Sequence, residues 1–159
     1  MSAHLQTVLD QILEERGGVA GIHLAFKDFS EGVSAHYEFY KRIMLADGLP
    51  LNRVYREYLA MITSQANRCA YCISHHSEAF QNQSENIPQG QIDLLNEFSE
   101  ILSRDAQRAY EFKDKFLSQS FTAAQWQHAV MIVSYFNFAN RLAFAMDLEL
   151  EPSFHVTCR

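Results

Sequence analysis

Apolar side chains recur at helical spacing along almost the whole chain, and this pattern limits the possible folds more than any other feature. Glycine and proline number only 6 and 3 among 159 residues. No stretch of strict apolar and polar alternation is long enough to suggest a sheet. Hydrophobic residues make up 48% of the chain, enough to build a sizeable core in one domain. We therefore expect an all-α, single-domain fold over residues 1–159.

Helix-capping and helix-breaking residues divide the pattern into separate helices. Ser30 and Asn52 can each cap a helix, and Thr122 with Gln125 forms a capping-box signature. Pro152 is expected to end regular structure near the C-terminus. The expected helices cover about residues 5–16, 31–47, 53–66, 68–80, 91–102, 104–117 and 123–146.

A cysteine pair followed by histidine is the strongest chemical signal in the chain. Cys69 and Cys72 stand three residues apart, and His76 follows four residues after Cys72. Each helical residue rotates by about 100°, so these three side chains share one helix face. The helix is expected to start almost at Cys69, where backbone N–H groups favour a thiolate.

Glu57 lies twelve residues before Cys69, in an apolar helical stretch. In one straight helix this offset would turn the carboxylate about 120° away from Cys69. The polar segment that ends at Asn67 can form a break, so that the next helix folds back toward Glu57. We expect the two thiols, the imidazole of His76 and this carboxylate to form a dithiol redox site with its own proton carrier.

With these four residues, the chain resembles the alkylhydroperoxidase D and carboxymuconolactone decarboxylase superfamily. The shared pattern is E-x(11)-C-x-x-C-x-x-x-H, and the run 135–143 (Tyr-Phe-Asn-Phe-Ala-Asn-Arg-Leu-Ala) is similar to the last helix of its peroxidase-related members. The resemblance covers about residues 49–151, preceded by a helical N-terminal extension over 1–48. It implies an alkylhydroperoxidase D-like fold with the cysteine pair at the start of a central helix. Decarboxylase members lack this pair, which favours redox chemistry here.

The resemblance also implies a function and a set of site residues. It predicts a thiol-dependent peroxidase that reduces hydroperoxides, or a partner's disulfide, through a dithiol and disulfide cycle. Cys69 and Cys72 would carry the cycle, with Cys72 facing the peroxide, while His76 and Glu57 would move the proton. His75 is a possible second relay residue. A lipoyl or thioredoxin-like dithiol would reset the disulfide, or a peroxiredoxin would act as partner, and no cofactor or metal is required.

Three other interpretations remain open from the residues alone. The protein could be a redox sensor or scaffold that keeps the dithiol with little turnover. The cysteines could bind structural zinc together with one of the two neighbouring histidines, with Glu57 or the other histidine as fourth ligand, although residues 84–127 hold no Cys or His to complete the usual pattern. They could also be small core residues of a helix.

Composition restricts the partners and the compartment. A net charge of −6 argues against nucleic acid, and no apolar run reaches the roughly 18 residues that suggest a membrane span. The segment from Met1 to Gln6 lacks the features of a signal peptide. We expect a soluble, cytoplasmic protein in which a close cysteine pair is catalytic or metal-binding.

The remaining notable residues lie toward the C-terminus. The last helix carries too many aromatic residues to bury within a small monomer, and family relatives form homo-oligomers, so a homo-oligomer is expected. Asn140 and Arg141 on this helix are assigned a structural role, such as pairing with a carboxylate across a subunit contact. Cys158 is expected to be a surface thiol with no role in turnover.

Overall fold

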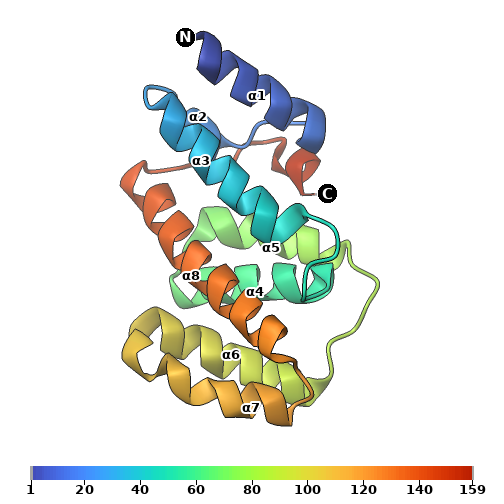
Figure 1. The fold of residues 1–159 in the computed structure, drawn as a ribbon. Helices are drawn as coiled ribbons and strands as arrows, with labels where there is room; N and C mark the ends of the chain where they lie inside the picture. Colours follow the sequence, from blue (N-terminus) through green and yellow to red (C-terminus); the bar gives the residue numbers. More distant parts are fainter. Residues whose placement is uncertain (1, 159) are drawn as a thin grey trace.

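The computed structural model describes residues 2–158, and within this range all regular structure is helical (Figure 1). The expected all-α fold is confirmed. Residues 1 and 159, the two ends of the predicted domain, lie outside the described range. No helix in the described part is long and apolar enough to cross a membrane. The α-helices are α1 (Ala3–Arg16), α2 (Gly21–Leu24), α3 (Ser30–Tyr40), α4 (Arg53–Ala66), α5 (Ala70–Gln81), α6 (Gln89–Arg104), α7 (Phe112–Ser118) and α8 (Ala123–Ala145).

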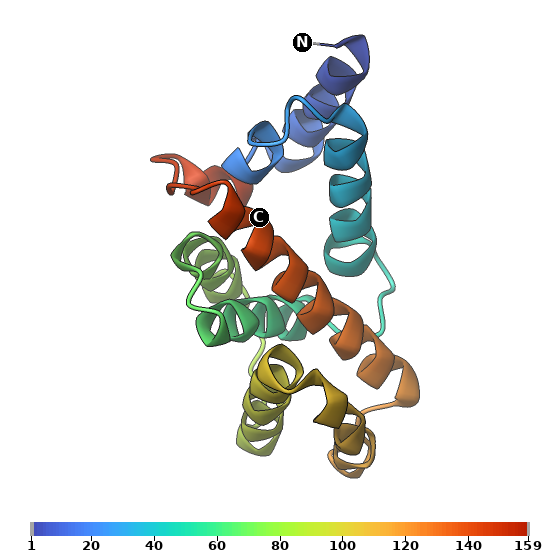
Figure 2. The ribbon, with the colours of Figure 1, turned by 90° about the vertical axis from the view of Figure 1, so that its left-hand side faces the viewer.

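Helix α4 forms the centre of the molecule and packs against α5, α6 and α8. The long α8 runs diagonally past these helices, with α6 and α7 at one end of the molecule and α1 to α3 at the other (Figures 1 and 2). The main core includes Leu59, Leu95 and Phe136. A second apolar cluster joins α1 to α3 through residues such as Leu5, Ile12 and Val33. The N-terminal helices therefore pack as a separate layer above the central helices.

The predicted caps are confirmed at one of three positions. Thr122 accepts the N–H of Gln125, whose side chain accepts the N–H of Thr122, so the capping box of α8 forms as expected. Asn52 occupies the N-cap of α4, but its side chain donates to Glu85 instead of capping. The prediction for Ser30 is wrong, because Phe29 precedes the helix and Ser30 is its first residue.

Several helix boundaries also differ from the predictions. The short α2 was not expected, and the predicted helix over 31–47 ends in a π-helical turn over Lys41–Leu45. The predicted helix over 104–117 starts as a 3-10 helix (Ala106–Glu111), because Asp105, with φ of −142° and ψ of 61°, leaves the helical conformation and separates it from α6. Regular structure continues beyond Pro152 in a 3-10 helix over Phe154–Thr157. That segment packs against α5, a tertiary contact that local sequence does not encode.

A sharp joint separates α4 from α5. Arg68 adopts a left-handed backbone conformation with φ of 59°, a geometry that usually requires glycine. The N–H of Cys69 then bonds the carbonyl of Ser64 at 2.9 Å, which satisfies the end of α4. The predicted break near Asn67 is confirmed, and it turns α5 back along α4.

Candidate active site

Cys69 occupies the N-cap position of α5, and Cys72 lies in its first turn. Both sulfurs are buried and form no disulfide in this structure. The hydrogen bond from the Cys72 thiol, followed by the backbone N–H groups of Cys72 and Tyr71, lowers the pKa of Cys69 to about 7, although burial opposes this shift. The same thiol contact, and then burial, raises the pKa of Cys72 well above its ordinary value of 9. The resting pair therefore favours a Cys69 thiolate that accepts the Cys72 S–H.

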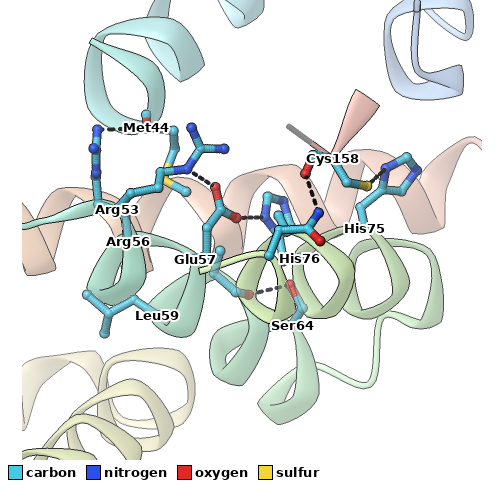
Figure 3. A network of polar contacts seen from close by, with 12 residues as sticks. Met44, Arg53, Arg56, Glu57, Leu59, Ser64, His75, His76 and Cys158 are labelled. Atoms are coloured by element: carbon cyan, nitrogen blue, oxygen red, sulfur yellow. Dashed lines mark hydrogen bonds and ion pairs between the residues drawn. The ribbon is translucent and has the colours of Figure 1, made fainter. Parts of the chain in front are cut away.

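Glu57 is completely buried and has two cationic or potentially cationic neighbours (Figure 3). His76 Nδ1 lies 2.7 Å from its Oε2, and Arg53 Nε donates to its Oε1 at 2.5 Å. Burial alone would raise the pKa of Glu57, but the His76 hydrogen bond and the charges of His76 and Arg53 outweigh it and lower the pKa. Glu57 is therefore a buried carboxylate anion, not a surface charge.

The contact with Glu57 fixes the state of the His76 ring. A carboxylate only accepts hydrogen bonds, so Nδ1 carries the proton and the lone pair of a neutral ring lies on Nε2. The ring also packs edge-on against Phe136, with centroids 4.5 Å apart. The predicted meeting of Glu57 and His76 across the α4–α5 joint is confirmed. The orientation leaves His76 with one free basic nitrogen.

A cavity of about 80 Å³ lies beside this pair. Cys72 and His76 line it, whereas Cys69 does not. The remaining lining comes from other residues of α5, from α1, α2, α3 and α8, from the segment between α1 and α2, and from the C-terminal segment, and it is mostly aromatic and apolar. Of the two sulfurs of the pair, the one that a small molecule in this cavity would meet is that of Cys72.

His75, the possible second relay residue, points to a different set of partners. Its Nε2 lies 3.1 Å from Glu151 Oε2, and burial first, then the charge of His76, lowers its pKa. Glu151 also accepts hydrogen bonds from Tyr71 Oη, at 2.8 Å, and from the N–H of Gly21. These contacts join α5 to α2 and to the C-terminal segment. His75 therefore holds the tail on the cavity wall, and its place in a relay with Glu57 stays untested.

The expectation that Cys158 is a surface thiol is wrong. Its side chain is buried, with Sγ 3.3 Å from the Phe154 carbonyl and 3.7 Å from His75 Nδ1. The 3-10 helix over Phe154–Thr157 folds it inward, and Asn82 Nδ2 donates to its carbonyl oxygen. Burial raises the pKa of this thiol to about 11, so Cys158 is a neutral thiol on the cavity wall.

Asn140 is a site residue whose position the sequence did not reveal. It is fully buried, donates to Ser64 Oγ at 3.1 Å and accepts from Asn67 Nδ2 at 2.9 Å. It also hydrogen-bonds the Cys72 thiol, which partly offsets the rise in the pKa of that group. Asn140 therefore has the expected structural role and also contacts a thiol of the pair. Its partners are uncharged groups, not a carboxylate. In the sequence, the signal for this role was a polar amide within a helix rich in aromatic residues.

Two arginines, Arg141 and Arg53, differ in their distance from the site. Arg141 is exposed and donates to the carbonyl of Asn137 in its own helix. Arg53, which the sequence analysis did not select, lies one turn before Glu57 and forms an ion pair with it. Its i,i+4 spacing from Glu57 was the signal that could have identified it.

Within residues 2–158, no cluster of three or more His, Cys, Asp or Glu side chains has the geometry to hold a metal ion, so the zinc alternative gains no support.

The fold and the site together define a class: an all-α protein in which a joint between two helices brings a buried carboxylate and histidine beside a cysteine pair. A model of the carboxymuconolactone decarboxylase family matches residues 34–89, a segment that contains Glu57, both cysteines and His76. Together with the fold, this match bears out the resemblance to the carboxymuconolactone decarboxylase and alkylhydroperoxidase D superfamily that the sequence indicated.

Solved structures share this fold. An uncharacterized peroxidase-related protein from Ralstonia eutropha JMP134, described as an alkylhydroperoxidase AhpD core, superposes with a TM-score of 0.80 at 19% identity over 100% of this chain and 91% of its own. A peroxidase-related protein from Silicibacter sp. TM1040 gives 0.79 at 20% identity over 97% and 88%. The debrominase Bmp8 gives 0.63 at 19% identity over 98% and 90%. Comparison with curated proteins gives no significant match.

Proposed function

We propose that the protein is a thiol-dependent peroxidase that reduces small hydroperoxides through the Cys69 and Cys72 pair. The observation that carries this proposal is a 2.7 Å contact between His76 and the buried Glu57 carboxylate. His76 lies on α5, the helix whose start bears both thiols. A nucleophile, a base and a group that orients the base are the parts that activated-thiol chemistry needs. The fold alone does not decide the activity, since a debrominase shares it.

The proposed cycle has two steps in the protein. Cys72, as thiolate, attacks one peroxide oxygen, the O–O bond breaks, and the alcohol leaves with a proton, so that ROOH becomes ROH and Cys72 becomes a sulfenic acid. His76 Nε2 takes the proton of the Cys72 thiol and returns it to the leaving oxygen, while Glu57 stabilises the imidazolium that forms. The Cys69 thiolate then attacks the sulfenic sulfur, the S–O bond breaks, and the hydroxide takes a proton from solvent and leaves as water, so that the two cysteines form a disulfide.

The two cysteines are assigned different tasks by position and acidity. Cys72 lines the cavity and keeps the higher pKa, and a less acidic thiol gives the more nucleophilic thiolate once its proton is removed. Cys69 is already poised as a thiolate at the helix start and so is ready to resolve the sulfenic acid. This division keeps the peroxide-facing role that the sequence analysis gave to Cys72.

Reduction of the disulfide needs an outside dithiol, and we propose a lipoyl group, a thioredoxin-like protein or a peroxiredoxin partner for this exchange. We also propose a homo-oligomer, because α8 leaves Phe138 and Phe144 about half exposed. Light scattering of the purified protein measures the subunit number directly. A monomer at all concentrations would contradict that part of the proposal.

The test is peroxide consumption by the purified protein with cumene hydroperoxide and dithiothreitol or dihydrolipoamide. We expect Cys69→Ser and Cys72→Ser each to lose at least tenfold in rate, and Cys158→Ser, the matched control, to keep at least half. Mass spectrometry after peroxide treatment should find a Cys69–Cys72 disulfide within the tryptic peptide 69–104. Peroxide loss at the buffer rate, or full activity in Cys72→Ser, would refute the proposal.

A further inference from the structure

Tyr40, the last residue of α3, contributes a phenol to the wall of the cavity that holds the reactive cysteine. Its side chain lines this cavity together with Cys72 and His76. Its ring centroid lies 6.5 Å from that of His76 and 5.9 Å from that of Tyr135. The π-helical turn Lys41–Leu45 follows directly, and such turns are rare and frequently lie at functional sites. Tyr40 is thus a polar side chain of the cavity close to the proposed base.

The hydroxyl of Tyr40 is enclosed and has no hydrogen-bond partner among the described residues. Burial, followed by the charge of Glu57, raises its pKa to about 12, so the phenol keeps its proton at physiological pH. The side-chain polar atoms in the described part of the chain that are both sealed and unpartnered belong to His23, Arg56 and Ser99. Tyr40 Oη is not one of them, so it keeps surface that a small molecule can reach. The phenol can therefore donate to a molecule in the cavity.

The other phenols that line the cavity are already engaged in hydrogen bonds. Each of them has a side-chain partner within 2.8 Å: Tyr37 with Glu15, Tyr71 with Glu151, and Tyr135 with His36. Among the described tyrosines of this wall, the donor that remains for a ligand is Tyr40.

Reduction of a hydroperoxide at Cys72 creates a need for such a donor. The S–O bond forms as the O–O bond breaks, and the leaving oxygen carries the electron pair until a proton reaches it. A hydrogen bond aimed at an oxygen that gains charge stabilises the transition state more than the ground state. The effect is larger in an enclosed, mostly apolar cavity than in water.

We propose that Tyr40 is a further catalytic residue, whose phenol donates a hydrogen bond to the leaving oxygen of the hydroperoxide while Cys72 attacks the other oxygen. The phenol keeps its proton throughout. The proton that completes ROH comes from His76, so the products remain ROH and the Cys72 sulfenic acid. This role rests on the proposed peroxidase function. Because the donor acts on the leaving oxygen and not on the thiol, its effect should grow with the basicity of the leaving group.

The experiment follows single turnovers of the reduced protein with three small electrophiles at one pH. Hydrogen peroxide releases strongly basic hydroxide, peracetic acid releases weakly basic acetate, and iodoacetamide releases iodide, a poor hydrogen-bond acceptor. Quenched-flow sampling and mass spectrometry measure the rate constant at Cys72 for each. We expect Tyr40→Phe to lose at least tenfold with hydrogen peroxide, less than threefold with peracetic acid, and nothing with iodoacetamide. Equal losses with all three electrophiles, or no loss with hydrogen peroxide, would overturn the proposal.

A matched control and a stability measurement exclude a merely structural role. Tyr110→Phe, at a tyrosine that is 75% exposed, should leave all three rate constants unchanged. Because Tyr40→Phe keeps the ring and removes a hydroxyl without a protein partner, its melting temperature should equal that of the parent. A clear fall in melting temperature would assign the hydroxyl a structural role and overturn the proposal.

The unmodified protein separates this proposal from the proposed function. If hydrogen peroxide does not oxidise its Cys72, the peroxidase function is refuted, and the role of Tyr40 with it. If Cys72 is oxidised at the same rate in the unmodified protein and in Tyr40→Phe, the peroxidase function stands and the role of Tyr40 alone is refuted.

Discussion

At the scale of single residues, Glu57 connects the stability of the protein to its chemistry. It is a fully buried carboxylate, and hydrogen bonds from His76 and Arg53 hold it as an anion. Removing the charge while keeping the shape therefore tests both the ion pairs and the proposed proton transfer. Glu14, exposed on α1, provides a matched control.

We expect Glu57→Gln to lower peroxidase turnover by about tenfold or more, because the neutral amide no longer stabilises an imidazolium at His76. The same change should lower the free energy of unfolding at pH 7 by about 1.5–3 kcal/mol, the range for hydrogen bonds to charged groups. Urea denaturation and steady-state rates measure the two effects, and Glu14→Gln should alter neither. Wild-type turnover in Glu57→Gln across pH 6–9 would remove Glu57 from the mechanism.

The same carboxylate predicts a dependence of stability on pH. The pKa of folded Glu57 lies below its ordinary value of 4.5, so its contribution is fully present above that pH and is lost as pH falls through the folded pKa. Wild type should therefore lose more free energy of unfolding than Glu57→Gln as the buffer is taken from pH 5 toward pH 3. Urea denaturation series at these pH values provide the comparison, and parallel slopes for the two proteins would contradict the prediction.

At the scale of helices, α8 contacts the segment around the thiol pair through the side chain of Asn140. Its amide joins α8 to Ser64 at the end of α4 and to Asn67 in the joint, and it reaches the Cys72 thiol. One buried side chain thus fixes the relative positions of three segments that converge on the site.

Asn140→Ala should lower the free energy of unfolding by about 1–3 kcal/mol, because buried partners of the amide lose a hydrogen bond. It should also move the pH profile of Cys72 alkylation upward, since the Asn140 hydrogen bond lowers the pKa of that thiol. Iodoacetamide labelling read by mass spectrometry measures this shift. The neighbouring exposed substitution Arg141→Ala should stay within about 0.5 kcal/mol and leave the profile in place. An unshifted profile in Asn140→Ala would argue against the contact with Cys72.

At the scale of the whole molecule, the C-terminal segment lies beside the end of α1 that is opposite the N-terminus (Figures 1 and 2). Glu151 on the C-terminal segment bonds Tyr71 and His75 of α5 and the N–H of Gly21 in α2. Arg16 of α1 donates to the carbonyl of Thr157. These contacts hold the N-terminal layer and the tail against α5, and thereby enclose Cys72.

Glu151→Ala should loosen this enclosure and increase the rate of Cys72 alkylation severalfold, because one carboxylate serves three partners from two other segments. We also expect a lower melting temperature, since its buried partners lose hydrogen bonds. Labelling kinetics and thermal unfolding measure the two effects. Glu149→Ala, an exposed neighbour, should change neither, and unchanged labelling in Glu151→Ala would show that the tail does not control access.

The sequence by itself determined the helical class and the reactive group. Helical spacing, few glycines and the capping signature at Thr122 indicated α-helices, because these signals act within a turn or two of the chain. The spacing of Cys69, Cys72 and His76 indicated one helix face for the same reason. Even the joint near Asn67 was predictable, since polar residues there interrupt an apolar stripe.

The tertiary structure alone decided which distant groups complete the site. Asn140, Glu151 and Cys158 reach α5 or its joint with α4 through contacts that span about 70 or more residues, and no local pattern specifies such contacts. Cys158 was misjudged because a short tail after Pro152 resembles a surface segment, whereas in the structure it packs against α5. The buried nitrogen of His23 on α2 that has no hydrogen-bond partner among the described residues is likewise evident only in the folded structure, because hydrogen-bond satisfaction depends on every neighbour and not on sequence position.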